Sequence, residues 1–196
     1  QCFGNNRTTP YLLFNAPAGQ AGVALPDSVV GAIPKVPEDM APSYLMEEGD
    51  AIIVTGLTPP EVRYFGLTPY LFSRTDEDGE RIPVFASLGD TLNHTNIQTA
   101  TGDPFGARFA LVLTSDAQTL GSVTTALVAS GTPPEAINTL VLPRDALRFG
   151  QDPQDDAVML MGRIAVNTTL DSAGQAAQTA YLEAPPLNVL PVAANE

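Results

Sequence analysis

The sequence predicts an α+β fold: a mainly antiparallel β-sheet or sandwich with one βαβ crossover, a C-terminal helix and an extended Pro-rich N-terminal arm. After residue 50, most apolar runs are strand-sized and are separated by Gly- and Pro-containing turns. One segment with helical apolar spacing lies between two apolar strands. Repeated prolines in residues 1–50 exclude a long helix there. We therefore expect an arm over 1–50 and a single α+β domain over 51–196.

The strands are expected where β-branched, aromatic or aliphatic residues run between turn signals. Asp78-Gly79 marks a hairpin turn, because a tight hairpin needs a residue with positive φ. The expected strands lie at 51–55, 62–66, 68–74, 82–88, 95–98, 107–113, 138–142, 157–166 and 187–192.

Two helices are expected. Ser115 and Gln118 have the spacing of a capping box, and Leu120, Val123 and Leu127 then follow at helical intervals until Gly131. The strands before and after this helix would be parallel neighbours joined by a crossover. A second helix, rich in small residues, is expected from about Asp171 to Leu182.

Composition excludes several classes of function. The net charge of −13 disfavours binding to nucleic acid or to anionic lipid. No apolar run approaches the roughly 18–20 residues that span a bilayer. With one histidine, His94, and one cysteine, Cys2, one subunit cannot form a zinc site from several His or Cys ligands. We expect no cofactor.

The densest polar stretch that could support catalysis contains Ser87, Asp90 and His94. A loop could bring these three together as nucleophile, orienting carboxylate and base. There is no G-x-S-x-G elbow, and turn hydrogen bonds by Asp90 and Asn93 explain the same residues. A serine-type hydrolase therefore stands as an alternative to a non-catalytic role.

Acidic clusters suggest a third candidate function, that of a cation-dependent surface or carbohydrate binder with calcium as the candidate ion. The residues concerned are a hairpin tip and a later loop: Asp76, Asp78, Glu80, Asp152, Asp155 and Asp156. The tip lacks the spacing of an EF-hand loop, which favours a solvated turn.

Aromatic residues on the strands favour either a core or a contact with another subunit. The candidates for a protein interface are Tyr64, Phe65, Tyr70 and Phe72.

The compartment is expected to be extracellular, periplasmic or an organelle lumen. The chain begins with Gln, which a removed signal peptide would explain. Asn6, Asn93 and Asn167 head N-x-T sequons and are glycosylation candidates in a eukaryotic secretory route. Cys2 has no second cysteine in the chain with which to form a disulfide.

Several segments resemble a group of uncharacterised exported proteins: Cys2–Asn6 with Thr9–Leu12, Arg63–Phe72, Phe85–His94 and Ala136–Pro143. A looser similarity, in the aromatic strands and the Ser-Leu-Gly-Asp turn, is to β-rich domains of bacterial envelope proteins. The resemblance implies an exported, mainly β fold, and no activity transfers with it. The Pro-rich arm, the aromatic strands and the scarcity of reactive side chains lead us to expect a non-catalytic structural or accessory subunit that acts through protein partners or as a homo-oligomer.

Overall fold

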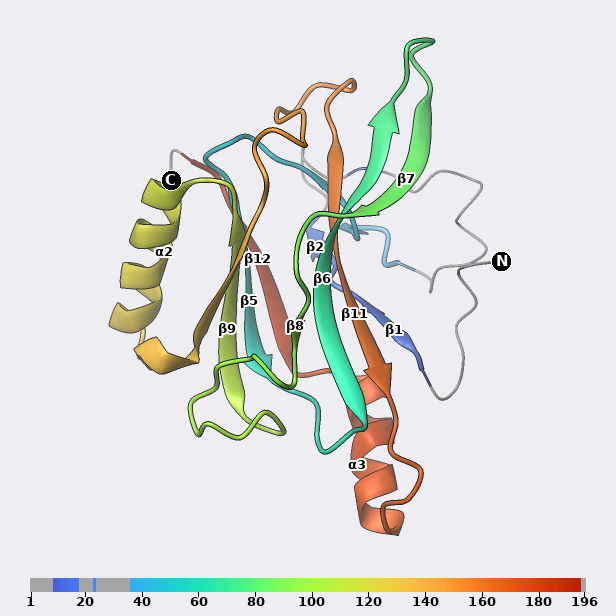
Figure 1. Cartoon of the computed structure of the whole chain (residues 1–196), viewed down its shortest axis with the longest axis vertical. Helices are drawn as coiled ribbons and strands as arrows, with labels where there is room; N and C mark the ends of the chain where they lie inside the picture. Colours follow the sequence, from blue (N-terminus) through green and yellow to red (C-terminus); the bar gives the residue numbers. More distant parts are fainter. Residues whose placement is uncertain (1–8, 18–22, 24–35, 195–196) are drawn as a thin grey trace.

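The computed structural model describes residues 9–17, 23 and 36–194, and in them the strands form two main sheets (Figure 1). A six-stranded sheet has the order β1-β11-β6-β7, with β4 also paired to β11 and β8 to β6. Its strands are β1 Tyr11–Leu13, β4 Tyr44–Leu45, β6 Tyr64–Thr75, β7 Arg81–Ser87, β8 Leu92–Asn93 and β11 Ala157–Ala165.

The second sheet is four-stranded, with the order β10-β9-β5-β12. Its strands are β5 Ala51–Leu57, β9 Arg108–Thr114, β10 Ile137–Val141 and β12 Leu187–Val192. Only the β9–β10 pair in this sheet is parallel, and helix α2 (Ala117–Ala129) with the 3₁₀ turn Pro134–Ala136 lies between these two strands in the chain. A short ladder joins β2 (Ala16–Pro17) to β3 (Met40–Ala41). The expected strand-rich α+β fold with two helices is confirmed.

The core lies between the two sheets. Leu67 and Leu160 of the six-stranded sheet share an apolar cluster with Val54, Phe109 and Leu111 of the four-stranded sheet. The run Ala110–Leu113 is fully buried, as expected for a strand covered on both faces. Helix α2 covers the outer face of the four-stranded sheet, and helix α3 (Ser172–Glu183) lies at one end of the six-stranded sheet (Figure 1).

In its described parts the N-terminal stretch packs on the rest of the chain as short extended segments. Strands β1 and β4 both pair with β11, and Phe14, Tyr44 and Met46 are buried in the core. The described segments before residue 50 therefore contribute apolar side chains to the same core as the later strands. Cys2 and Asn6 lie outside the described residues.

Three local expectations are wrong. One continuous strand, β6 (Tyr64–Thr75), stands where two strands were expected at 62–66 and 68–74. No strand occurs at 95–98, where side-chain oxygens of Asn93 and Asn96 accept backbone hydrogen bonds and hold a turn. The N-cap of α2 is Asp116, whose carboxylate accepts from the Thr119 amide, while the Ser115 hydroxyl donates to the Glu48 carbonyl.

Two of the sheet edges are blunted by proline. In the described part of the chain β7 and β12 each end a sheet, and they contain Pro83 and Pro191. Backbone hydrogen bonds join Asp76 to Glu80 at the end of the β6–β7 ladder, and Leu57 to Pro186 at the end of the β5–β12 ladder. From there, hydrogen-bonded and non-hydrogen-bonded residue pairs alternate along each antiparallel ladder. Pro83 and Pro191 both fall at non-hydrogen-bonded pairs, so their ring nitrogens point to the free edge. A further strand would find a missing donor there.

Candidate functional site

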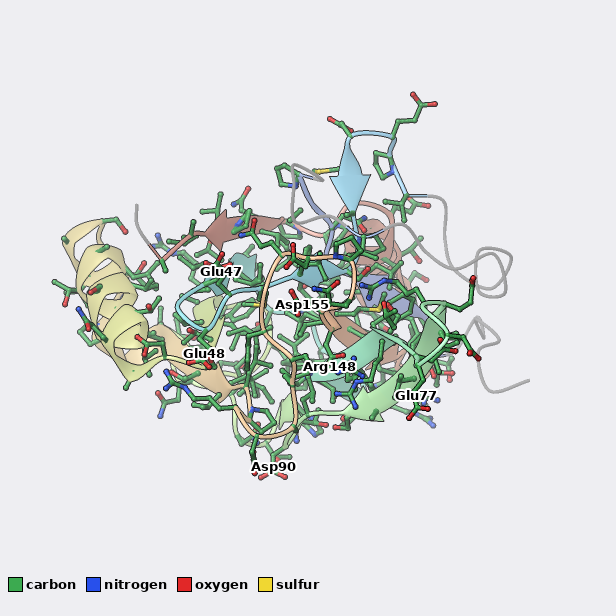
Figure 2. All side chains as sticks on the ribbon, turned by 90° about the horizontal axis from the view of Figure 1, so that it is seen from above. Glu47, Glu48, Glu77, Asp90, Arg148 and Asp155 are labelled. Carbon is green, nitrogen blue, oxygen red and sulfur yellow. The ribbon has the colours of Figure 1, made fainter. Side chains whose placement is uncertain are left out.

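The structure does not bring Ser87, Asp90 and His94 together. Ser87 lies opposite Tyr70 of β6, whereas Asn93, next to His94, lies opposite Gly66, four residues or about 14 Å further along the strand. The Ser87 hydroxyl donates to the Gly89 carbonyl (3.0 Å), and Asp90 is exposed at the margin of the molecule (Figure 2). This register separates the nucleophile from the base.

His94 lies among aromatic rings. Its ring stacks on Phe105 (centroids 6.1 Å apart, planes at 20°) and meets Tyr64 edge-on at 5.5 Å. Its buried Nδ1 has no hydrogen-bond partner among the described residues. No described carboxylate therefore orients this imidazole as a catalytic base requires.

The aromatic residues proposed for an interface mostly build the interior. Phe65 and Phe72 are buried, and the half-buried Tyr64 and Tyr70 contact the rings of His94 and Phe85. Since two of the four are inaccessible, they do not form a contact surface together. Alternation along β6 accounts for this, because successive side chains of a strand point to opposite faces of the sheet. Phe65 joins one apolar cluster and Phe72 joins another.

Several of the acidic side chains proposed for calcium accept hydrogen bonds from the protein itself. Asp76 accepts from the amides of Asp78 and Glu80 and so closes the hairpin turn, in which Gly79 has a φ of 86°. Asp155 accepts from the Asp152 amide. Among the described residues, no three His, Cys, Asp or Glu side chains are grouped so that they could hold a metal ion.

The sequons have a local structural role. In Asn93-His-Thr95 and in Asn167-Thr-Thr169, the asparagine oxygen accepts from the threonine amide and from its hydroxyl, the latter at 2.7 Å in both. The N-x-T spacing is thus accounted for by two Asx turns of the same geometry.

Asp156, by contrast, is the centre of a charged cluster. Its side chain is 1% exposed, and Arg74 of β6 donates to both carboxylate oxygens, with Nε 2.8 Å from Oδ1. The Arg148 amide donates to Oδ2 at 2.9 Å. Burial acts to raise the pKa of Asp156, but these hydrogen bonds and the nearby guanidinium charges outweigh it, so its pKa lies below the ordinary value.

Two further arginines extend the cluster. Arg81 of β7 donates to the carbonyls of Pro153 and Asp155, and burial lowers its pKa. The Arg148 guanidinium donates to the Thr75 carbonyl (3.3 Å). We call Arg74, Arg81, Arg148 and Asp156 the Asp156 cluster. It ties the β6–β7 hairpin, at the ladder pairs next to the Asp76–Glu80 turn, to the loop that precedes β11.

The turn end of the hairpin extends past the neighbouring strands (Figure 1). On β7 the side chains of Ile82 and Val84 are 43% and 39% exposed, although both are apolar. The tip carries carboxylates, and Figure 2 shows Glu77 directed outward. The hairpin is therefore a projecting element that is held next to its acidic tip, and its strand β7 carries exposed apolar side chains.

Sequence reasoning missed the Asp156 cluster because it assigned Asp156 to a cation site. Arg74 and Asp156 are 82 residues apart, and nothing in either neighbourhood indicates the pairing. Composition was the available signal, because the chain holds only eight arginines. Arg74, Arg81 and Arg148 lie near acidic segments in the sequence and could have been considered as ion-pair partners of those carboxylates.

A second exposed feature is a groove of about 610 Å³ beside helix α2. The helix supplies one wall through Thr119, Ser122 and Ala126, and the outer face of β5 and β12 supplies Ile53 and Val192.

The described helices include none that is both long and apolar enough to cross a bilayer.

Comparison with known protein families, with curated proteins and with solved structures finds no match to this chain.

Proposed function

We propose that this protein is a non-catalytic accessory subunit that contacts a protein partner through the β6–β7 hairpin. The observation that carries the proposal is the exposure of two apolar residues, Ile82 and Val84, on a strand whose turn end is fixed by the Asp156 cluster. Exposed apolar side chains grouped on one element are typical of interaction surfaces.

The fixed position of the hairpin's turn end favours binding. An interface loses affinity when it must order mobile side chains and loops, at about 0.5–1.5 kcal/mol for each immobilised long side chain. The arginines of the Asp156 cluster already hold both strands of the hairpin and the adjacent loop. The hairpin therefore loses little conformational freedom when it binds its partner.

The hairpin also indicates the chemistry of the partner. Carboxylates at its tip favour a basic surface, and such complementarity raises the association rate at low salt. Because the ring nitrogen of Pro83 points to the free edge, the partner would contact side chains of β7 without adding a strand to the sheet.

A photo-crosslinking amino acid placed at residue 82 tests this in the native organism. We expect one defined protein adduct, and after purification of that partner we expect Val84→Asp to weaken its binding at least tenfold. Val141→Asp is the matched control, since Val141 is an apolar residue 62% exposed on the other sheet. Equal losses in the two variants, or binding that strengthens with salt, would contradict a hairpin contact with a basic partner.

The hydrolase alternative has its own measurement. Turnover of an ester or amide panel by purified, metal-free protein, lost in both Ser87→Ala and His94→Ala with folding intact, would overturn a non-catalytic role. We expect no turnover, because Ser87 and His94 lie beside different parts of β6 and are too far apart to form a nucleophile–base pair.

A further inference from the structure

The groove beside α2 lies on an incompletely covered face of the four-stranded sheet. Helix α2 packs its Val123 against Ile53 and Val112 of the sheet, while Leu190 on the outer face of β12 stays 52% exposed. Leu190 pairs with Ile53 and lies two residues before Val192, so the three apolar side chains adjoin one another on one face. The groove thus has an apolar floor open to solvent.

The walls of the groove are almost without charge. Of the residues that line it, only Asp116 is ionisable, and its carboxylate is paired with Arg144 at 2.7 Å. Helix α2 itself has no charged residue over Ala117–Ala129. This neutrality contrasts with the net charge of −13 on the chain.

We infer that the occupant of this groove is helix α2 of a second copy of the chain. Two molecules of charge −13 repel one another, so they approach at least cost where neither presents charge. Because α2 is a wall of the groove, a two-fold axis beside Ser122 and Ala126 places each α2 between the helix and the β12 face of the other copy. One contact then fills both grooves.

The size of this face indicates a reversible dimer. Thirteen helical residues span about 20 Å, which puts the contact at the small end of specific interfaces. Sheet continuation does not compete at this edge, because the ring nitrogen of Pro191 points to the free side of β12.

Sedimentation equilibrium over a concentration series tests the inference. We expect a monomer–dimer equilibrium that tightens severalfold when salt rises from about 0.05 to about 0.5 M, since salt screens the mutual repulsion. Ala126→Glu should weaken the dimer tenfold or more by placing like charges in contact. Ala176→Glu makes the same change on the exposed face of α3 and should leave the dimer unchanged.

Three results would overturn the inference: a wild-type monomer at every concentration and salt, a dimer indifferent to Ala126→Glu, or a dimer weakened by salt. Circular dichroism of both variants establishes that they are folded. Val84→Asp should not affect the dimer. The dimer measurement and the partner-binding measurement can therefore fail independently of each other.

Discussion

The β6–β7 hairpin and helix α2 both present exposed surfaces, but different forces hold the two elements in place. Charged groups fix the hairpin: one carboxylate with 1% exposure receives hydrogen bonds from two chain segments. Helix α2 is fixed by apolar contacts of Val123, Leu120 and Leu127 with the sheet. The comparison teaches that a buried charge depends on all its partners at once, whereas apolar packing loses stability in proportion to the contact removed.

The largest effect is expected for Asp156→Ala. Removing one member of a buried ion pair leaves the others unpaired, at about 3–5 kcal/mol, and since the Arg74 side chain is 33% exposed we expect about 2–3 kcal/mol in urea unfolding. The neighbouring Asp155→Ala is the control, because it removes one hydrogen bond of a surface turn, worth about 1 kcal/mol. Equal losses would show that Asp156 has no special role.

A smaller loss is expected for Val123→Ala on the other side of the comparison. Val123 of α2 is buried against Ala51, Ile53 and Val112 of the sheet. Deleting two methyl groups should cost about 1–2 kcal/mol in the free energy of unfolding. The loss should be the same at pH 4 and pH 7, which distinguishes it from the loss at Asp156.

The pH dependence of stability sharpens the contrast. The pKa of Asp156 is lower in the folded than in the unfolded chain, so its contribution is complete above about pH 5 and is lost as the pH falls through about 3.9 and then through the folded value. We therefore expect the stability difference between wild type and Asp156→Asn to shrink below about pH 4. Asp116, whose pKa the Thr119 amide also lowers, is present in both proteins and cancels. A constant difference down to pH 2 would show that the charge of Asp156 does not stabilise its contact with the hairpin.

The smallest effects on folding are expected for the two exposed surfaces. Ile82→Asp on the hairpin and Ala126→Glu on α2 should each change the free energy of unfolding by no more than about 0.5 kcal/mol. Their consequences should appear in binding and in association, respectively. A destabilisation above about 2 kcal/mol in either would mean that the surface serves folding and not contact.

Local pattern was enough to locate many of the elements. The turn at Asp78-Gly79, the run that became β9 and the last strand Leu187–Val192 lie where alternation and turn chemistry indicated. The N-cap was misassigned by one residue, because serine and aspartate are both good caps and the Ser115 hydroxyl found the Glu48 carbonyl instead. Local rules could not decide between two adjacent residues whose partners are distant.

What the sequence by itself determined is the inventory: a strand-rich chain, strongly anionic, with one imidazole and few places for soft-metal or nucleophilic chemistry. Only the tertiary structure decided which of these groups meet. It set Ser87 and His94 at different positions along β6, and it brought Arg74 to Asp156 from 82 residues away. The physical reason is that side-chain periodicity is a property of each strand, whereas register and sheet order depend on how all strands bury their apolar faces together.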